Sequence, residues 1–443
     1  MLNVAYNRWM SSNNYVDFFR QTSPYIHAHR GRTFVIALGG DAVSHANFHS
    51  AVHDIALLQS LGIRIVLVHG ARPQIDRRIS LSELNSQFSG HRRITDSDAM
   101  LCVKEAVGST RLQIESELSM GLPNSPMHGA EIRVIGGNFI TAKPVGIIDG
   151  VDFQYTGETR RIDASAIEQQ LSENALVLIS PIGFSPTGET FNLSYQEVAT
   201  QVSIALNAHK LIFLSEARGI LRDEVLIRSL SLPEVSALAV KSTDLAEQQL
   251  LSCAYQACRN GVDRVHLVGC AEDGALLSEL LTRDGSGTLI VKDYSEVVRF
   301  ATIEDVGGIL MLIAPLEGQQ VLVKRSRELL ENEISRFMVV VHPEGLLLGC
   351  AALYPTADET IGELACVAIH SEFHGQGIAS RLLQEIEKES QKKGLHRLFV
   401  LTTQTAHWFL EKGFVEAKVT DLPAQKQSLY NYQRNSRIFS KSI

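Results

Sequence analysis

The chain has 443 residues, of which 45% are hydrophobic, and it carries a formal net charge of −8 at pH 7. This length exceeds one ordinary domain, so we expect two or three. The acidic balance argues against general nucleic-acid binding, which needs a basic surface, and no apolar run approaches the roughly 20 residues of a membrane span.

Cysteine usage and the N-terminal segment indicate a cytoplasmic protein. The six cysteines are scattered, with no C-x-x-C pair and no metal-ligand spacing. We therefore expect reduced core thiols and no metal, with a disulfide framework as the alternative. Residues 1–14 also lack the basic start and the sustained apolar run of a secretory signal.

Residues 1–292 are interpreted as one domain in which strands and helices alternate. It opens with a helix over residues 11–30 (within an N-terminal segment 1–30), followed by a buried-type strand at 33–40 that ends in two glycines. Further strands are expected near 64–70, 132–144, 175–183, 210–221 and 262–268, and helices near 47–61, 164–172, 195–208 and 244–260. Such alternation implies an α/β fold, a mainly parallel sheet covered by helices on both faces.

Five ordered segments of this domain resemble the amino-acid kinase family, most closely the N-acetylglutamate kinases. They lie at residues 23–40, 66–75, 93–96, 192–199 and 285–288. The resemblance implies an αβα sandwich. Its departures fall on groups that phosphoryl transfer needs, because the family's lysine is Ala37, its aspartate is Gln196 and the substrate loop carries Ala71 and Arg72. We therefore predict a domain that no longer acts as a kinase.

The same resemblance implies that this domain is regulatory. Arginine-inhibited kinases of the family bind arginine with a Tyr in the N-terminal helix, a His, a Glu and a Gly, and this sequence matches at Tyr25, His266, Glu279 and Gly285. A carboxylate can pair with a guanidinium bidentately, and turn carbonyls can accept its remaining donors. The alternative is that His266 is an ordinary strand histidine and Glu279 a solvated helix residue. The family's N-terminal helix also assembles hexamers, which implies a similar homo-oligomer here.

A linker near residues 292–296 leads into a second domain, residues 297–443. The order there is strand, helix, helix, two strands at 337–343 and 346–355, a central block, a strand at 396–403 and a helix at 405–414. This mixture of elements predicts an α+β domain.

The central block, residues 360–387, gives the clearest signal for chemistry. A strand-like run from Glu363 to Ile369 is followed by a polar turn, and the segment from His374 to Ala379 opens an amphipathic helix. Glycines let the backbone approach a ligand, and the free N–H groups of a helix start favour a phosphate or pyrophosphate. An ordinary βα turn is the alternative, while a Rossmann site is disfavoured because Leu382 stands where a third glycine is required.

This block resembles motif A of the GCN5-related N-acetyltransferases, Arg/Gln-x-x-Gly-x-Gly/Ala, with His374 in place of the usual Arg or Gln. The resemblance implies that loop amides hold the pyrophosphate of acetyl-CoA, the co-substrate, and that the N–H groups of Cys366 or Val367 hold the thioester oxygen. A nucleophilic role for Cys366 is the less favoured alternative to a small buried thiol. The residues assigned to acetyl-CoA are Cys366, Val367, Ala368, His374, Gly375, Gln376, Gly377, Ile378 and Ala379.

Acetyl transfer to an amine needs a neutral amine, a stabilised oxyanion and a proton for the leaving thiolate. Glu363 at the start of the central strand is our candidate base, and a solvated edge-strand glutamate is the alternative. Many acetyltransferases place a Tyr as thiolate acid in the helix after the next strand, but Phe409 lies there. The remaining candidates for that acid are hydroxyl groups, first Thr402 or Thr403, of which strand alternation lets only one face the site, and then Tyr430 and Tyr432.

The acceptor is inferred from cationic residues in two segments, 321–328 and 430–437. Arg325 and Arg434 are candidates to clamp two carboxylates, with Lys324 and Ser436 in support, and a solvated charged face is the alternative.

Together the two domains resemble the bacterial N-acetylglutamate synthase family along essentially the full chain. That resemblance implies acetyl transfer from acetyl-CoA to glutamate, the first step of arginine biosynthesis, with feedback inhibition by L-arginine. The alternatives are a working amino-acid kinase fused to an acetyltransferase, a non-catalytic arginine sensor, and a protein-acetylating enzyme.

Overall fold

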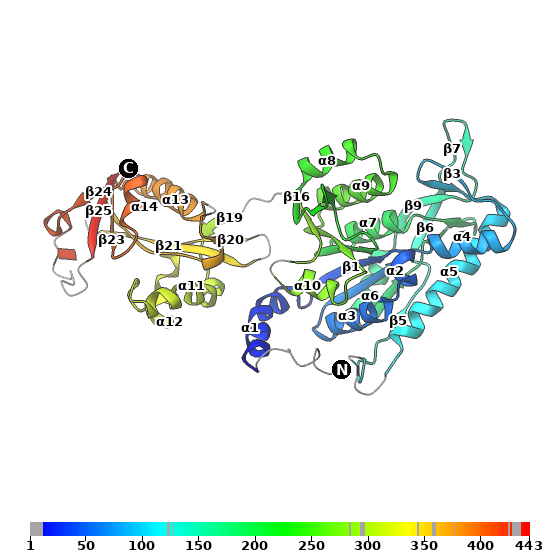
Figure 1. The fold of residues 1–443 in the computed structure, drawn as a ribbon, viewed down its shortest axis with the longest axis horizontal. Coiled ribbons are helices and arrows are strands. Elements are labelled where there is room, and N and C mark those ends of the chain that lie inside the picture. Colours follow the sequence, from blue (N-terminus) through cyan, green and yellow to red (C-terminus); the bar gives the residue numbers. More distant parts are fainter. Residues whose placement is uncertain are drawn as a thin grey trace, which may run out of the picture. The chain divides into compact units, whose positions relative to one another are not determined.

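The computed structural model describes residues 12–443 except 122–124, 126, 283–284, 293–296, 343–344, 357–359, 376, 424–425 and 428–435. The chain divides into two compact units, Met1–Tyr294 and Ser295–Ile443, each with its own hydrophobic cores (Figure 1). None of the helices in the described part of the chain is long and apolar enough to cross a membrane.

The first unit is built on an eight-stranded sheet in which every neighbouring pair is parallel except β17 and β18. Its strands, in sheet order, are β16 (Ser229–Ser231), β18 (Thr288–Val291), β17 (Arg264–Gly269), β13 (Lys210–Ser215), β1 (Thr33–Leu38), β2 (Arg64–His69), β10 (Leu176–Ile179) and β5 (Val134–Ile135).

Helices cover both faces of this sheet, because successive side chains of each strand point to opposite sides. On β1, Val35 and Ala37 enter one core, whereas Phe34, Ile36 and Leu38 enter the other. The first core is closed by α6 (Ala164–Ser172), α7 (Tyr195–Ala205), α8 (Leu232–Lys241) and α9 (Leu245–Arg259), and the second by α1 (Ser12–His29), α2 (Gly40–Ser44), α3 (Phe48–Ser60), α5 (Ser97–Leu118) and α10 (Ala275–Leu281). The predicted αβα sandwich with a mainly parallel sheet is confirmed.

A second, smaller sheet in this unit was not expected from the sequence. The segment 132–144, interpreted as one strand, is two: β5 ends the large sheet, and β6 (Ile140–Pro144) follows the interruption at Gly136-Gly137. The small sheet has the order β12 (Thr190–Asn192), β11 (Ile182–Phe184), β6 and β9 (Gly157–Ile162). The remaining elements are α4 (Arg72–Leu81) and three hairpins, β3–β4 (Gln87–Ser89, Arg92–Ile94), β7–β8 (Ile147–Ile148, Val151–Asp152) and β14–β15 (Leu221–Arg222, Val225–Leu226).

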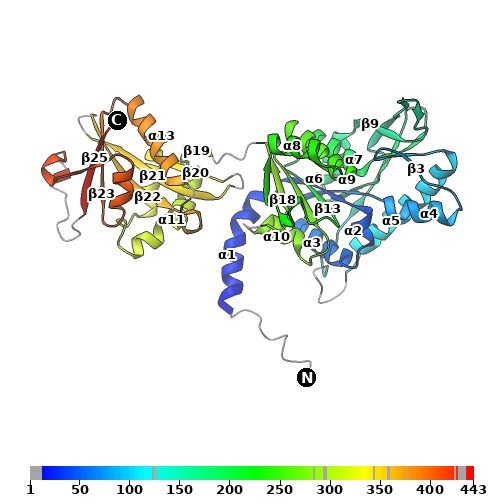
Figure 2. The same cartoon turned by 45° about the horizontal axis from the view of Figure 1, so that its top comes forward.

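The second unit is the predicted α+β domain, with a seven-stranded sheet and helices on both faces (Figure 2). In sheet order the strands are β19 (Val297–Phe300), β20 (Phe337–Val341), β21 (Leu347–Pro355), β22 (Ile361–Ile369), β23 (Arg397–Thr402), β25 (Arg437–Ser442) and β24 (Val415–Ala417). One face is covered by α11 (Val306–Gly318) and α12 (Arg327–Glu333), and the other by α13 (Ile378–Lys392) and α14 (Ala406–Glu411). Short 3-10 turns lie at Ile303–Asp305, Ile334–Arg336, Ser371–Phe373 and Val419–Asp421.

Strands β22 and β23, in the middle of the second sheet, pair over only part of their length and then diverge. Their parallel pairing covers only Ile361–Glu363 against Arg397–Phe399, after which β22 continues along β21 and β23 continues along β25. Beyond Glu363, therefore, the facing edges of these two strands diverge. Such an opening exposes main-chain groups of β22 to a ligand.

Candidate active site and effector site

The glycine turn before α13 is open on the side of the helix start. Gly375 and Gly377 have φ of 81° and 79°, and a Cβ atom added at either would meet no described heavy atom within 4 Å. Gly377 is the N-cap of this 15-residue helix, and no side-chain cap is present among the described residues. The first N–H groups of α13 are thus available to an anion such as a pyrophosphate.

The other residues assigned to this turn occupy different positions. The His374 ring shares a hydrogen bond with the carbonyl of Ile369, 3.1 Å away, so it is tied to the end of β22. Ile378 is buried in the core beneath the sheet, while Ala379 is partly exposed. Gln376 lies outside the described residues.

A β-bulge interrupts β22 just beyond Glu363. Ala365 pairs with Ala352 and Ala368 with Cys350, so Cys366 and Val367 together oppose a single residue of β21. Cys366 has a φ of 53° and joins the core on the α11 side, whereas Val367 packs on the α13 side. A hydrogen bond with Cys350 lowers the pKa of the buried Cys366 thiol; burial opposes this shift and the charge of Arg325 adds to it.

Glu363 occupies the last paired position before the strands diverge. It is aligned with Phe399 of β23 and Tyr354 of β21, and its side chain is 14% exposed. Its Oε2 lies 2.5 Å from Nζ of Lys426, a contact that sequence reasoning missed. A carboxylate held at the mouth of the opening is in place to accept a proton from an amine there.

The two candidate threonines at the end of β23 differ in their surroundings. The Thr402 hydroxyl lies 2.9 Å from that of Thr405 and accepts hydrogen bonds from the N–H groups of Gln404 and Thr405, so it also shapes the turn before α14. Thr403 is exposed. Phe409, at the family's tyrosine position, is buried in the core.

The acceptor candidates are only partly described. Arg325 is half-buried, with its main-chain N–H on Glu317 Oε1 at 2.9 Å and its Nη1 on the carbonyl of Val323 at 3.3 Å. Lys324 is exposed and Ser436 is buried. Arg434, Tyr430 and Tyr432 lie outside the described residues.

In the kinase-like unit the glycine turns after β1 and β2 are filled by side chains. A Cβ atom at Gly70 would lie 2.8 Å from Cδ1 of Tyr195, and one at Gly39 would lie 3.2 Å from the same residue's hydroxyl. Asp41 adds a carboxylate, whose Oδ2 accepts from the N–H of Glu216 at 2.8 Å. Ala37 is fully buried in the core beneath α7. The backbone of these two turns is therefore approached closely by a phenol ring and a carboxylate.

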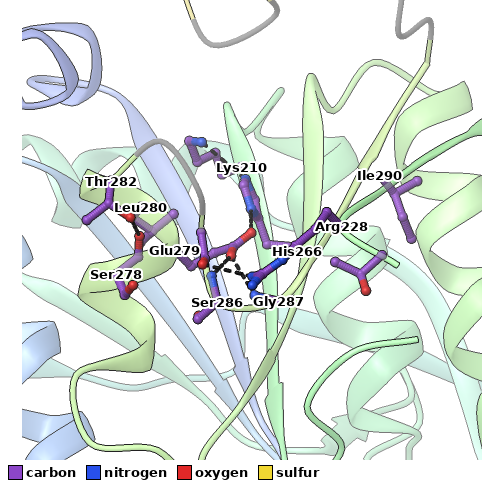
Figure 3. A network of polar contacts seen from close by, with 12 residues as sticks. Lys210, Arg228, His266, Ser278, Glu279, Leu280, Thr282, Ser286, Gly287 and Ile290 are labelled. Atoms are coloured by element: carbon purple, nitrogen blue, oxygen red, sulfur yellow. Dashed lines mark hydrogen bonds and ion pairs between the residues drawn. The ribbon is translucent and has the colours of Figure 1, made fainter. Parts of the chain in front are cut away.

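Three of the four residues expected to bind arginine, His266, Glu279 and Gly285, come together beside β17, and Figure 3 shows the first two. His266 and Glu279 are fully buried, with His266 Nδ1 2.7 Å from Glu279 Oε1. Glu279 Oε2 accepts from the N–H groups of Ser286 and Gly287 at 2.7 and 2.8 Å. Gly285 has a φ of 61°, and a Cβ atom there would lie 2.5 Å from Glu279 Oε2.

Lys210 completes this network, and sequence reasoning missed it. Its Nζ lies 3.1 Å from His266 Nε2, and the side chain is buried in β13. Burial and then the charge of Lys210 lower the pKa of His266 to about 4, so the neutral ring donates to Glu279 and accepts from Lys210. Burial alone would raise the pKa of Glu279, but the bonds from His266, Gly287 and Ser286 lower it. A lysine inside the apolar strand 210–215 was the available signal.

Tyr25, the fourth expected residue, lies at the C-terminal part of α1 and is buried. Its ring centroid is 6.5 Å from that of His29, whose Nε2 lies 2.9 Å from the carbonyl of Leu280 in α10. The end of α1 is therefore joined to the helix that carries Glu279.

In the described part of the chain, the cysteines and acidic groups form neither a disulfide nor a cluster that could hold a metal ion. All six cysteines are buried and free of disulfides. Within the described residues, His, Cys, Asp and Glu form no group of three or more that could hold a metal ion.

Comparison with known families agrees with this division of the chain. Residues 32–269 match the amino acid kinase family, and residues 333–416 match the acetyltransferase (GNAT) domain. Fold and site thus define a GNAT acetyltransferase that carries an amino acid kinase-like domain.

Relatives along the whole chain narrow the class. The amino-acid acetyltransferase of Azotobacter vinelandii is 52% identical over 431 residues, covering 97% of this chain and 100% of the relative, and that of Pseudomonas fluorescens is 51% identical over 430 residues, covering 97% and 99%. The structure of N-acetylglutamate synthase from Neisseria gonorrhoeae with coenzyme A and L-arginine is 36% identical, covers 97% of this chain and 99% of its own, and has a TM-score of 0.84. This chain belongs to the amino-acid acetyltransferase family.

Proposed function

We propose that this chain transfers the acetyl group of acetyl-CoA to the α-amino group of L-glutamate, and that L-arginine inhibits it through the kinase-like domain. The observation that carries the proposal is the likeness to the Neisseria gonorrhoeae N-acetylglutamate synthase complexed with coenzyme A and N-acetyl-glutamate, 37% identical over 97% of this chain and 99% of the other, with a TM-score of 0.61. The open glycine turn and the position of Glu363 support it from the chain's own geometry.

The proposed reaction is a direct attack with no acyl-enzyme. Glu363 removes a proton from the substrate ammonium, and the freed nitrogen attacks the thioester carbonyl carbon. The N–H groups of Cys366 or Val367 stabilise the oxyanion. When the C–N bond has formed, the positively charged nitrogen releases its second proton to solvent, the C–S bond breaks and its electron pair leaves on sulfur. Thr402 or Thr403 then donates a proton to the thiolate and is reprotonated by solvent.

Substrate binding divides between two groups of residues. The main-chain N–H groups from Gly375 to Ala379, at the start of α13, hold the pyrophosphate of acetyl-CoA. Arg325 and Arg434, with Lys324 and Ser436 in support, hold the two carboxylates of glutamate.

The proposed arginine site is the buried network around Glu279. The guanidinium of arginine pairs with the Glu279 carboxylate, with Tyr25, His266 and the turn at Gly285 around it. Because Glu279 accepts from Ser286 and Gly287, a guanidinium that pairs with this carboxylate shares it with the turn or displaces those two bonds. Binding thereby alters the turn, which gives arginine a means of changing the domain.

The proposal includes a kinase-like domain without phosphoryl transfer, because Ala37 and Gln196 replace the lysine and the aspartate that the family uses, and Tyr195 and Asp41 crowd the backbone of the two glycine turns. It also includes a domain boundary near residues 292–296, a cytoplasmic location and a homo-oligomer, a hexamer assembled through α1. Light scattering of the purified chain at several concentrations measures the oligomer directly.

The decisive experiment follows thiol release from acetyl-CoA with a panel of amino acids, with and without L-arginine. We expect release that depends on glutamate and falls when arginine is added. Phosphoryl transfer from ATP to N-acetylglutamate, measured beside it, should be absent. ATP consumption without glutamate-dependent thiol release would overturn the proposed function.

A further inference from the structure

Tyr354 of β21 is the residue directly opposite Glu363 in the sheet. The two residues are aligned across the β21–β22 ladder, and the Tyr354 ring packs against the core on the α11 side. Its hydroxyl donates to Oε2 of Glu333, at the end of α12, over 2.6 Å. The guanidinium of Arg336 lies over the ring, 5.0 Å from its centroid. A tyrosine held at both its ring and its hydroxyl has little freedom to move.

The same hydroxyl also contacts Arg325, the proposed anchor for an acceptor carboxylate. The Arg325 guanidinium interacts with the Tyr354 oxygen, and the polarity of this contact follows from the groups themselves, since a guanidinium only donates and the phenol proton goes to the Glu333 carboxylate. Tyr354 therefore accepts from Arg325 and donates to Glu333. Together with the Val323 carbonyl, the hydroxyl fixes the guanidinium while leaving it further N–H donors for a ligand.

The hydroxyl also keeps two opposite charges apart. Glu333 accepts the Tyr354 hydroxyl proton on the side of the phenol opposite Arg325. It also forms an ion pair with Arg336, whose Nη1 lies 3.5 Å from Glu333 Oε1. A direct pair between Arg325 and Glu333 would neutralise the guanidinium that is meant for the substrate. With a neutral phenol between them, the positive charge of Arg325 stays directed at whatever occupies the opening.

We propose that Tyr354 is a positioning residue that sets specificity for an acidic amino acid, by fixing Arg325 and by keeping Glu333 from capturing it. The inference rests on the proposed function, because it takes Arg325 as a contact of the acceptor's carboxylate. It adds a determinant, the relay from Arg325 through Tyr354 to Glu333, that the acceptor contacts by themselves do not contain.

The test replaces Tyr354 by Phe in the full-length protein, which removes the hydroxyl and keeps the ring under Arg336. We expect KM for glutamate to rise about tenfold, with kcat and the KM for acetyl-CoA within about twofold of wild type. The preference for glutamate over glutamine, compared as kcat/KM, should fall by about the same factor as KM rises. Tyr255→Phe, a partly buried tyrosine of α9, is the matched control and should change none of these values.

A second variant tests the capture of Arg325. If Glu333 forms an ion pair with the Arg325 guanidinium once the Tyr354 hydroxyl is removed, then adding Glu333→Gln to Tyr354→Phe should restore most of the lost glutamate affinity. Failure of the double variant to recover would overturn the charge-separating role.

The remaining outcomes separate this inference from the proposed function. Arg325→Gln should raise the KM for glutamate whatever Tyr354 does. If it does so while Tyr354→Phe leaves KM and preference unchanged, the positioning role is wrong and the function stands. An equal loss in kcat and in acetyl-CoA affinity for Tyr354→Phe would also overturn it, since that is the signature of a general structural defect. Wild-type protein that releases no thiol with glutamate would instead contradict the function itself.

Discussion

The two domains of this chain use the same local device and treat it in opposite ways. Each ends a buried strand in a glycine turn that faces the start of a helix. At Gly375 and Gly377 the space above the turn is open to a ligand. At Gly39 and Gly70 the corresponding space holds the ring of Tyr195 and the carboxylate of Asp41.

The contrast teaches that a glycine turn permits ligand binding without ensuring it. Glycine removes the Cβ atom and so lets any group approach the backbone, whether a phosphate or a neighbouring side chain. In the kinase-like domain the neighbour comes from the start of α7, more than a hundred residues along the chain from β2. Burial and then the charge of Asp41 raise the pKa of the Tyr195 hydroxyl, so the side chain next to these turns stays a neutral phenol.

The largest effect is expected from a variant that removes the proposed catalytic base of the acetyltransferase domain. Glu363→Gln should lower kcat for glutamate acetylation about 10²–10³-fold, within the usual range for loss of a general base. Acetyl-CoA affinity, measured by calorimetry, should stay within about twofold because the glycine turn is untouched. Unchanged turnover would exclude Glu363 as the base.

Arginine binding is assigned to the kinase-like domain, and a substitution at Gly285 should weaken it. An Ala side chain there would crowd Glu279 Oε2, so Gly285→Ala should weaken inhibition by arginine by tenfold or more while leaving uninhibited turnover near wild type. Gly274→Ala is the matched control, since its φ of 72° imposes the same backbone strain with open space around the methyl group. Dose–response curves for arginine measure both, and equal curves would contradict the proposed site.

The open turn itself can be narrowed by one methyl group. Gly377→Ala should raise the KM for acetyl-CoA about tenfold, because the new methyl group and the strain of a positive φ both act at the start of α13. Gly394→Ala, at a φ of 75° just past the other end of the same helix, shares the strain of about 1–2 kcal/mol but not the ligand. If Gly377→Ala and Gly394→Ala raise the KM for acetyl-CoA by the same factor, the glycine turn before α13 is not the acetyl-CoA site.

The smallest expected effect is a pH dependence of the kinase-like domain's stability. Burial is the main cause that lowers the pKa of His29 to about 3 and those of His69 and His266 to about 4. Unfolding lets each ring take up a proton below its ordinary pKa of 6.5, so stability should fall as pH drops from about 6.5 toward 4. Each histidine contributes up to about 1.4 kcal/mol per pH unit.

Asp54 acts in the opposite direction. Burial and then Asp273 raise its pKa to about 7, so in the folded state it keeps a proton that the unfolded state releases above pH 3.8, and its contribution grows as pH falls. Asp54→Asn should therefore steepen the loss of stability on acidification. Thermal unfolding of the full chain from pH 7.5 to 4.5 measures both slopes, and a flat wild-type profile would contradict the buried neutral histidines.

Local patterns predicted most of the fold. Apolar runs bounded by turns located β1, β2, β10, β13 and β17 of the large sheet but not β16 or β18, and helical spacing located α3, α7, α9 and α13. Helix α5 was not anticipated, although its buried residues Val103, Val107, Thr110 and Ile114 follow helical spacing. The small sheet was missed for a different reason: β11 and β12 have three residues each, too few to show a period, and they are fixed by pairing with distant strands.

The residues of the candidate site could be predicted only where they lie close together in one short segment of the sequence. The glycine turn and Glu363 are neighbours in sequence, so a short stretch carries the signal. Lys426 beside Glu363, and Lys210 beside His266, depend on contacts over more than 50 residues. From the sequence Tyr195 is recognisable only as part of a motif, because nothing local indicates that its ring packs against the turns after β1 and β2.

The extra residue in β22 has a consequence for how this protein can change. Side chains of a strand alternate between faces, so Glu363 and Cys366, three apart, would normally point in opposite directions. The added position at Cys366 brings both toward the α11 side. Deleting Cys366 would restore regular alternation and leave Val367, Ala368 and Ile369 on the faces that they occupy now, but it would return the main-chain groups of the bulge to regular pairing with β21. The length of this strand, and not only its residue types, therefore determines which main-chain groups stay outside the ladder at Cys366.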